Sequence, residues 1–426
     1  MYANYDVIIV GAGLGGLTCG AVLAAQGRKV LICERNNKAG GYVTGFYKGG
    51  FAFDAVHTLI GGCGQGEIIS NVLELISPSL PVSFQQVDPI TKIVLPDLEF
   101  DFQSWNLSLE LENLFPEEEQ NILSFLQEIE KINAEKTSLV FSKPAYLLSP
   151  LERAALEMKT RLTKPKLYKY RFKTASDVLG SFFKEERLKT IFHTVVPWER
   201  ASFLQLAQRW TAFLKRGLYY PKGGYQALAN CFVDGFLNQG GQLILNSQVA
   251  KILLQGEKAV GVELTDGTKI STDKVVAGCD LRETLEVLVG KEHFPEEYFN
   301  SLAVKKLSSS AFYVYLGVSI PEDRIPFSRA VLCSVNNIEQ FSGHLEDGET
   351  CPVFIDIPNK YDPDMAAGGN SIIILSVPAS VSDLNNWGIN GTGLSGKKYN
   401  VLKAEIADKL IERCEKLIPG LKERIV

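Results

Sequence analysis

Residues 7–16 have the sequence VIIVGAGLGG, and this stretch decides the fold that the chain can adopt. Val7–Val10 is a short, continuous apolar run, as expected for a strand that is buried on both faces of a parallel sheet. The glycines that follow fit a turn that opens onto a helix of small residues, predicted over Leu17–Gln26. Gly27 can end that helix, and Val30–Cys33 predicts a second parallel strand. Together these segments predict a βαβ unit.

The spacing of the glycines and of one acidic residue is that of a dinucleotide-binding turn. Gly11 permits the tight turn, Gly13 lets the backbone approach a pyrophosphate, and Gly16 lets the helix pack closely on the sheet. The helix N-terminus supplies free N–H donors. Glu34, 23 residues after Gly11, is placed to accept hydrogen bonds from the adenosine ribose hydroxyls. The candidate dinucleotide contacts in this unit are Gly11, Gly13, Leu14, Gly15, Gly16 and Glu34.

The same region is also the most apolar part of the chain, because residues 7–25 carry no charge. By hydropathy alone it could be a signal peptide or a membrane span. A signal peptide has a basic segment before its apolar run, whereas here the only preceding charge is Asp6. The glycines in the run each cost an isolated helix roughly 1 kcal/mol relative to alanine, which argues against a membrane span.

Composition narrows the classes of protein that fit. The chain has 426 residues, 46% of them apolar, and a formal net charge of −5, so two or three globular domains are expected and general nucleic-acid binding is not. The eight cysteines form no C-x-x-C pair and the four histidines lie far apart, so neither a metal site nor a secreted disulfide framework is indicated. A reducing compartment, by default the cytoplasm, is expected.

A second glycine cluster follows the βαβ unit, with the sequence NNKAGGYVTG over residues 36–45. It resembles the second glycine motif of FAD-dependent oxidoreductases of the amine oxidase and phytoene desaturase superfamily. The segment 50–62 is similar to the part of those proteins that passes close to the flavin. The resemblance implies that the cofactor is FAD. It also implies further cofactor contacts at Arg35, Gly40, Gly41, Tyr42 and Val43.

A third block supports the same family. YYPKGGY at residues 219–225 leads into a predicted amphipathic helix, and residues 242–278 are rich in strand patterns, with Asp266-Gly267 as a hairpin turn. This block resembles the phytoene desaturase, carotenoid isomerase and retinol saturase family. The resemblance implies that the backbone of Val249 contacts the adenine of FAD. Residues 277–279 are Ala-Gly-Cys, where that family usually has Ser-Asn-Ala or a similar sequence.

The family resemblance implies an α/β fold: a Rossmann-like FAD-binding domain of the GR2 type with an inserted α+β substrate domain. We expect the FAD-binding domain over residues 1–84 and 218–290, and the substrate domain over residues 85–217 and 291–426. Residues 421–426 look like the start of a strand that returns to the FAD-binding domain. The family continues from there with a glycine-rich segment that contacts the flavin, and this segment is absent, so a truncated chain is expected.

The implied activity is that of an FAD-dependent oxidoreductase on a long apolar isoprenoid or carotenoid-like polyene, either desaturation or cis–trans isomerisation, with saturation as a third mode. The alternatives are another flavoenzyme of the amine oxidase superfamily and a non-catalytic protein that binds flavin or lipid. No catalytic residue is identified. His57 could orient substrate or be a structural donor, and Cys63 could attach flavin covalently or be a buried thiol.

One segment of the inserted domain is strongly basic. Residues 159–173 contain seven basic residues and no acidic one, interleaved with leucine, tyrosine and phenylalanine. Such a segment can dock on an anionic membrane, which an enzyme with a lipid-dissolved substrate would need. It can equally be a solvated face beside the substrate cleft. No nucleic-acid-binding module accompanies it.

Overall fold

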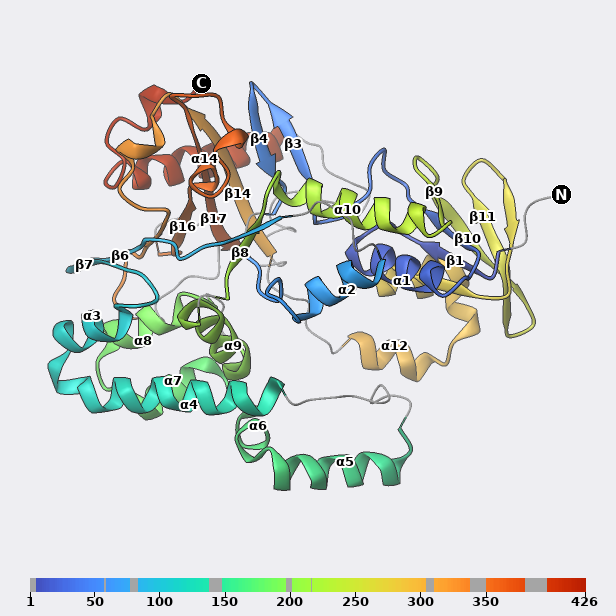
Figure 1. Cartoon of the computed structure of the whole chain (residues 1–426), viewed down its shortest axis with the longest axis horizontal. Coiled ribbons are helices and arrows are strands. Elements are labelled where there is room, and N and C mark those ends of the chain that lie inside the picture. The colour runs from blue at the N-terminus through green and yellow to red at the C-terminus, as the bar shows by residue number, and fades with distance from the viewer. Residues whose placement is uncertain are drawn as a thin grey trace. The chain divides into compact units, whose positions relative to one another are not determined.

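The computed structural model describes residues 5–56, 59–76, 83–137, 148–196, 201–215, 217–303, 310–337, 350–379 and 397–426. The chain forms two compact units whose segments alternate along the sequence (Figure 1). The nucleotide-binding unit consists of Met1–Gln86, Tyr219–Leu307 and Tyr361–Ala367. The sheet–helix unit consists of Val87–Leu218, Ser308–Lys360 and Gly368–Val426.

The nucleotide-binding unit is built on a parallel sheet with the strand order β13-β1-β2-β9. Its strands are β1 (Val7–Val10), β2 (Val30–Cys33), β9 (Gln242–Ile244) and β13 (Val275–Ala277). Every residue of β1 and β2 is buried, because apolar side chains on both faces of these strands are covered. Helix α1 (Leu14–Ala25) connects β1 to β2, and Gly27, which follows its C-cap Gln26, has a φ of +78°. The predicted βαβ unit and the α/β fold are therefore confirmed.

Helix α10 (Gly224–Asn238) packs on α1 in the same unit. Gly20 of α1 allows this close packing, since a Cβ there would lie 2.8 Å from Cδ1 of Ile32 and 3.3 Å from the ring of Phe236. The predicted hairpin at Asp266-Gly267 joins two strands of a small antiparallel sheet. The remaining elements of this unit are β3 (Gly45–Lys48), β4 (Phe51–Asp54), α2 (Ile68–Ile76), β5 (Phe84–Gln86), β8 (Tyr219–Pro221), β10 (Val249–Gln255), β11 (Lys258–Leu264), β12 (Lys269–Ser271), α11 (Leu281–Glu283), a π-helical segment (Thr284–Gly290), α12 (Glu296–Ala303) and 3₁₀ turns at Lys291–His293 and Pro363–Met365.

The sheet–helix unit contains a mixed sheet with the strand order β14-β17-β16-β15-β6-β7. Its strands are β6 (Thr91–Leu95), β7 (Leu98–Phe102), β14 (Ser310–Val318), β15 (Arg329–Leu332), β16 (Val353–Asp356) and β17 (Ser371–Ala379). Only the pair β15–β6 is parallel among the strand pairs described. One face of the sheet packs on α14 (Lys397–Cys414) through an apolar cluster. This unit therefore has the α+β character expected of the inserted domain.

A helical layer packs on the other face of this sheet at its β6–β7 end. Its helices are α3 (Leu107–Leu114), α4 (Glu119–Thr137), α5 (Pro150–Thr163), α6 (Pro165–Tyr170), α7 (Ala175–Phe182), α8 (Glu186–His193) and α9 (Phe203–Leu214). Aromatic rings fill the space between the helices. The ring of Phe125 lies 4.6 Å from that of Phe192, which stacks on Phe183 at 5.3 Å and meets Trp210 edge-on at 5.4 Å. These offset and edge contacts are the favoured geometries for buried aromatic pairs.

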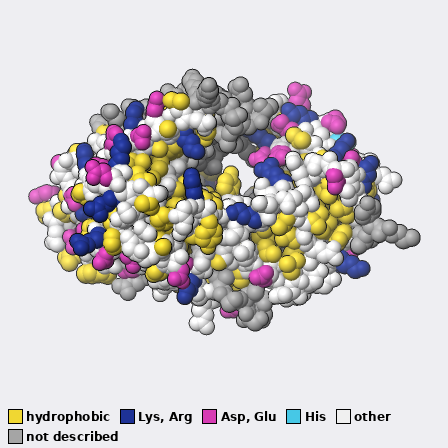
Figure 2. Space-filling view, turned by 90° about the horizontal axis from the view of Figure 1, so that it is seen from above, with side chains coloured by type: hydrophobic (Ala, Val, Ile, Leu, Met, Phe, Trp, Pro, Cys, Tyr) yellow, Lys and Arg dark blue, Asp and Glu magenta, His cyan; other side chains and the backbone are white. Residues whose placement is uncertain are grey.

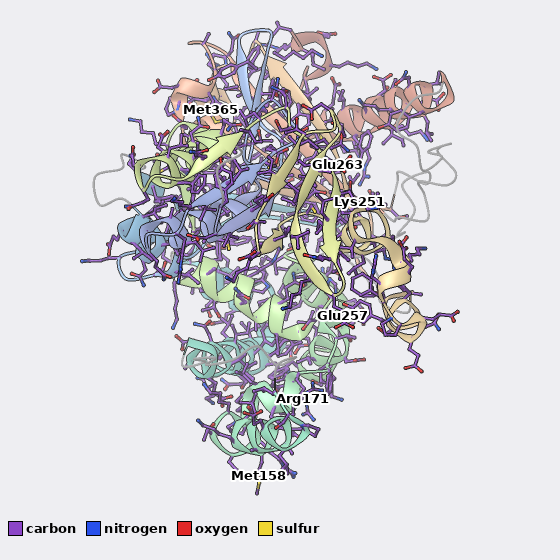
Figure 3. The ribbon with its side chains drawn as sticks, turned by 90° about the vertical axis from the view of Figure 1, so that its right-hand side faces the viewer. Met158, Arg171, Lys251, Glu257, Glu263 and Met365 are labelled. Carbon is purple, nitrogen blue, oxygen red and sulfur yellow. The ribbon has the colours of Figure 1, made fainter. Side chains whose placement is uncertain are left out.

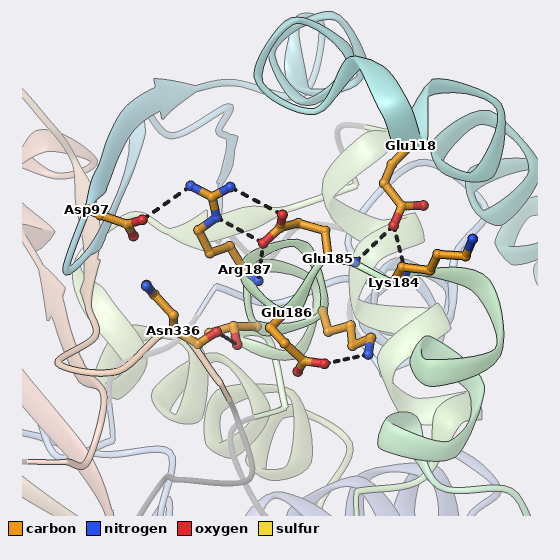
Figure 4. Close-up of polar contacts among 9 residues, drawn as sticks. Asp97, Glu118, Lys184, Glu185, Glu186, Arg187 and Asn336 are labelled. Carbon is orange, nitrogen blue, oxygen red and sulfur yellow. Dashed lines mark hydrogen bonds and ion pairs between the residues drawn. The ribbon is translucent and has the colours of Figure 1, made fainter.

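The start of α8 is fixed by carboxylates (Figure 4). Oε1 of the buried Glu118 accepts hydrogen bonds from the backbone N–H groups of Lys184 (2.6 Å) and Glu185 (2.9 Å). Burial opposes ionisation of Glu118, but its hydrogen bonds outweigh that effect and hold its pKa below the usual range. Arg187 donates from Nε to Glu185 and from Nη1 to Asp97. The bend between α7 and α8 is thereby held in one conformation.

The end of the chain differs from the sequence prediction. Residues 421–426 were expected to begin a strand of the FAD-binding domain, but the structure places them in the sheet–helix unit. Lys422–Arg424 forms a 3₁₀ turn, and Ile425 makes a single bridge to Val318 of β14. The side chain of Leu421 is buried in the cluster under α14, so this anchor directs the segment along β14 instead. The expected domain boundary at 290 also differs, since α12 lies in the nucleotide-binding unit.

His193 makes the stability of the sheet–helix unit depend on pH. Its side chain is fully buried, its Nδ1 has no hydrogen-bond partner among the described residues, and its Nε2 lies 3.4 Å from Oγ of Ser176. Burial lowers its pKa from 6.5 to about 4. Between about pH 6.5 and 4 the unfolded chain therefore binds one more proton than the folded chain. The free energy of unfolding is thus highest, as far as His193 is concerned, above about pH 6.5, and it decreases as the pH falls below that value.

We expect His193→Leu to be less sensitive to acid than the wild type. Between pH 7.5 and pH 4.5 the wild type should lose about 2 to 3 kcal/mol more unfolding free energy than the variant, because leucine takes up no proton. Urea unfolding followed by tryptophan fluorescence at the two pH values measures this difference. Equal losses for both proteins would show that His193 does not titrate as its burial implies.

Candidate dinucleotide-binding site

The first glycine turn lies at the carboxyl end of β1. Gly11 has a φ of +98°, and its N–H donates to the carbonyl of Cys33 at the end of β2 (2.8 Å). Gly13 is the N-cap of α1, and no described side chain caps this helix. Gly16 lies so close to the turn that an added Cβ would be 2.1 Å from the carbonyl oxygen of Gly11. The turn, which includes Leu14 and Gly15, thus presents an uncapped helix N-terminus suited to a phosphate group.

The second glycine cluster packs directly against this turn. Gly40 forms a bridge with Gly13, and its N–H donates to the carbonyl of Ala12 (2.9 Å). A Cβ added to Gly41 would lie 3.2 Å from Cα of Gly13. Val43 closes the loop by donating its N–H to the carbonyl of Gly40 (2.9 Å), whereas the side chain of Tyr42 is exposed. The structure thus brings together two glycine clusters that the sequence separates.

Glu34 is buried at the end of β2, beside the first turn. Its Oε2 accepts the N–H of Ala12 (2.7 Å), and its Oε1 accepts both the backbone N–H (2.9 Å) and the side-chain amide (2.8 Å) of Asn36. The carboxylate is therefore held at the edge of the turn, where an acceptor for ribose hydroxyls is needed. Arg35, in contrast, is exposed, and its Nη1 lies 3.9 Å from Oε1 of Glu283.

Val249 begins strand β10 and is buried in an apolar cluster with Val10 and Cys33, the last residues of β1 and β2. The backbone just before it is tied to the Glu34 loop, because the N–H of Ser247 donates to the carbonyl of Glu34 (2.7 Å). Val249 therefore lies near the carboxyl ends of the parallel strands. This is the edge at which open α/β sheets bind their ligands.

Two residues that position this site had not been identified from the sequence. The first is Gly278, whose N–H donates to the carbonyl of Val10 (2.8 Å) and whose added Cβ would lie 3.4 Å from Cα of Gly16. The second is Gln226 of α10, which bonds the carbonyl of Ala39 (3.2 Å) and the hydroxyl of Thr44 (2.6 Å) at either end of the second glycine cluster. A glycine at the end of the strand-rich stretch 242–278 was a usable signal for the first residue, whereas no local pattern marks a single glutamine on a helix.

The start of α10 is held by two buried aspartates. Asp54 at the end of β4 accepts the O–H of Tyr220 at Oδ2 (2.5 Å) and the N–H of Tyr225 at Oδ1 (2.8 Å), and Asp362 accepts the N–H of Gly223 (2.6 Å). Burial, reinforced by Asp54, raises the pKa of Tyr220 far above its usual range, so the phenol remains a hydrogen-bond donor. These contacts fix the helix that carries Gln226.

Of the two residues considered for a direct chemical role, only Cys63 lies among the described residues. His57 lies outside the described residues. Cys63 is buried, and burial, together with the nearby Glu67, raises the pKa of its thiol to about 12, so the thiol is protonated at neutral pH. Among the described residues, no group of three or more His, Cys, Asp or Glu side chains is placed to hold a metal ion. In the same described part of the chain, no helix is long and apolar enough to span a bilayer.

The chain as a whole is similar to several known proteins. A family model described as flavin containing amine oxidoreductase matches residues 14–377. Prolycopene isomerase 1 of an Oncidium hybrid cultivar is 30% identical, over 99% of this chain and 71% of its own length, and phytoene desaturase (lycopene-forming) of Pantoea ananas is 23% identical, over 98% and 83%. A crystal structure of an oxidoreductase from Methanosarcina mazei is similar, with a TM-score of 0.62 and 16% identity, over 98% of this chain and 85% of that one.

Proposed function

The chain belongs to the flavin-containing amine oxidoreductase family, and from this premise we propose that it is an FAD-dependent enzyme that isomerises or desaturates a long apolar polyene. The similarity to prolycopene isomerase carries the proposal, because at 30% identity it extends over 99% of this chain. The family match confirms the sequence prediction of an FAD-dependent oxidoreductase. The choice of substrate and of reaction is our inference.

The nucleotide-binding unit supplies the residues that would hold FAD. Backbone N–H groups of the first glycine turn would bind the pyrophosphate, and the carboxylate of Glu34 would bind the adenosine ribose. Gly40 and Gly41 carry no side chain, and Gly41 lies directly against Gly13. When bound, FAD supplies the hydride chemistry, and the protein supplies orientation and an environment that excludes water.

The sheet–helix unit offers a surface suited to an extended apolar substrate. Tyr313 and Tyr315 of β14 stack with ring centroids 6.0 Å apart and are partly exposed. They lie on the opposite face of the strand from Val314 and Leu316, which pack under α14. Phe354 of β16 shares the face of Tyr313, because both pair with Ser376 of β17, and it joins these rings to the core of the helical layer, against which it packs. A row of flat rings favours contact with a planar polyene over contact with a small polar substrate.

Isomerisation and desaturation can be separated by one experiment. Purified protein loaded with FAD is incubated without oxygen with prolycopene, after reduction of the flavin, and separately with phytoene and an electron acceptor. An isomerase gives a product of unchanged mass from prolycopene, whereas a desaturase gives a product that has lost pairs of hydrogens from phytoene. Chromatography with mass detection identifies both products.

The alternatives give different results in the same assay. A yellow protein that converts neither polyene but oxidises a primary amine would belong to another branch of the family. A protein that binds FAD and turns over none of these substrates would be a non-catalytic binding protein. Either result would contradict the proposed function and leave the family assignment intact.

A further inference from the structure

Helix α5 is well formed, yet none of its fourteen residues, all of them described, is buried. A capping box begins it, since Ser149 Oγ accepts the N–H of Glu152 (3.3 Å) and Glu152 accepts the N–H of Ser149 (2.7 Å). Helices of this length are marginally stable in water unless an apolar face is packed against something. Helix α5 therefore contacts the rest of its unit without burying any side chain of its own.

The apolar residues of α5 form two groups on opposite sides of the helix. Leu156 and Thr160 face the rest of the helical layer, where they line an apolar pocket of about 430 Å³ between α4, α5, α6 and α9. Leu151, Met158 and Leu162 have the i, i+7, i+11 spacing of one stripe, and their exposed fractions are 84%, 66% and 72%. Figure 3 shows Met158 at the outer edge of the sheet–helix unit, pointing away from it.

Basic side chains border this outer stripe. Lys159 and Arg161 flank the stripe, one on each side of it. Basic residues commonly flank a helix stripe that faces a membrane in this way. Beyond α5, the guanidinium of Arg171 stacks 3.5 Å over the ring of Tyr168 and next to Phe172, whose side chain is 86% exposed. Residues 150–173 carry eight basic and two acidic residues in a chain of net charge −5, so the rest of the chain carries −11.

Not every basic residue of the segment 159–173 belongs to this surface. Lys166 forms an ion pair with Glu128 of α4 (2.7 Å), and the ammonium of Lys164 donates to the carbonyl of Glu135 (2.9 Å). These two lysines attach α6 to α4 and are engaged within the unit. The apolar stripe and its flanking charges on α5 therefore make up the exposed surface, which the sequence alone did not distinguish from the rest of the basic segment.

We propose that α5 lies on the surface of an anionic lipid bilayer, with Leu151, Met158 and Leu162 in the acyl region and Lys159 and Arg161 at the headgroups. A stripe of large apolar residues bordered by cations matches the two layers of such a surface. In a symmetric dimer this face would meet its own copy, and the net positive charge of both copies would oppose association. Elsewhere, as on the face in Figure 2, acidic side chains are interspersed among the basic ones.

If α5 lies on the bilayer, the apolar pocket between α4, α5, α6 and α9 can receive a chain that leaves the lipid. Leu156, Leu167 and Leu204 make its wall apolar, and it lies directly beneath the helix that contacts the lipid. An acyl or polyene chain that leaves the bilayer would find there a surface of similar polarity. The docking proposal does not depend on the polyene substrate, because it rests on α5 alone.

Co-sedimentation with vesicles tests the docking surface. Wild-type protein should bind vesicles of phosphatidylcholine with about one third phosphatidylglycerol, bind pure phosphatidylcholine far less, and dissociate as salt is added. Met158→Asp with Leu162→Asp should weaken binding about 100-fold, since two large apolar side chains no longer enter the acyl region. Lys159→Glu with Arg161→Glu should weaken it about 30-fold or more.

Matched controls use exposed residues elsewhere. Leu109→Asp with Val401→Asp changes two exposed apolar residues on α3 and α14. Lys251→Glu with Lys258→Glu changes two exposed lysines of the β10–β11 hairpin, of which Figure 3 shows Lys251. Both controls should bind anionic vesicles within twofold of wild type, apart from the general effect of net charge. Circular dichroism and flavin content should be unchanged in all four variants, because every substituted side chain is exposed.

Three results would overturn the docking proposal. The first is equal sedimentation of the Met158→Asp/Leu162→Asp variant and the wild type. The second is a wild type that ignores vesicles but forms a dimer that this variant dissociates on gel filtration. The third is a wild-type protein that binds RNA in preference to anionic vesicles. Turnover of a detergent-dispersed polyene is measured in parallel, so failure of the proposed enzymatic function is seen separately from failure of docking.

Discussion

Gly16→Ala is expected to destabilise the nucleotide-binding unit strongly, although alanine is by far the better helix former. Helix propensity alone would favour alanine by up to about 1 kcal/mol. The added Cβ, however, would lie 2.1 Å from the carbonyl oxygen of Gly11, and both atoms belong to backbone that is fixed by the β1–α1 turn. Since no flexible side chain can move aside, overpacking should cost about 3 kcal/mol or more, and the steric effect exceeds the gain in propensity.

Alanine substitutions at two neighbouring glycines distinguish an effect on folding from an effect on cofactor binding. No described atom lies within 4 Å of a Cβ added to Gly15 or to Gly13. Gly15→Ala should therefore fold as the wild type does. Gly13→Ala should also fold but bind FAD at least tenfold more weakly, because its methyl group would occupy the space of the pyrophosphate. Thermal unfolding and flavin titration measure the two effects, and a stable, yellow Gly16→Ala protein would contradict the packing described for α1.

Glu34→Lys is expected to abolish FAD binding. The substitution removes the carboxylate that would bind the ribose hydroxyls, and it places an ammonium beside the N–H groups of Ala12 and Asn36, which then lose their acceptors. Each unsatisfied buried donor costs about 1 to 3 kcal/mol, so the turn should be destabilised as well. The ratio of flavin absorbance to protein absorbance after purification in the presence of FAD measures the loss.

Glu34→Gln is the matched control, because it keeps one acceptor oxygen and nearly the same shape. It should remain folded and bind FAD about tenfold to a hundredfold more weakly, as expected when a charge-assisted hydrogen bond becomes a neutral one. A Glu34→Lys protein that retained FAD at a full one-to-one ratio would show that the carboxylate does not bind the ribose. A colourless wild-type protein that bound NAD instead would contradict the flavin assignment itself.

Several features of the site could be predicted because they depend on short, contiguous patterns. The strand Val7–Val10, the glycine turn and the helix after it lie within about twenty residues, and each has a local signature of its own. The position of Glu34 could be predicted from the same pattern, because the short strand β2 ends beside the first glycine turn, where Glu34 accepts the N–H of Ala12. The hairpin at Asp266-Gly267 is equally local, with Gly267 in the left-handed region at a φ of +86°.

Other features could not be predicted because they depend on residues that are distant in the sequence. Asp362 lies 139 residues from Gly223, whose N–H it accepts, and no periodicity connects the two. The C-terminal residues looked like a strand of the FAD-binding domain, yet burial of Leu421 under α14 directs them along β14. The basic segment 159–173 looked uniform, whereas Glu128 and Glu135 engage only some of its lysines.

The sequence by itself determined the βαβ unit and the dinucleotide turn with its acidic partner, because steric limits on glycine and the burial of short apolar runs act locally. The flavin family was indicated by the resemblance of the later glycine motifs to those of known flavoproteins. Only the tertiary structure decided how Gly40 and Gly41 meet Gly13, how Gln226 and Gly278 support them, and which face of α5 is exposed. These arrangements arise when elements far apart in the chain pack together. The resulting hydrogen bonds and close contacts select one of many arrangements that the local patterns allow.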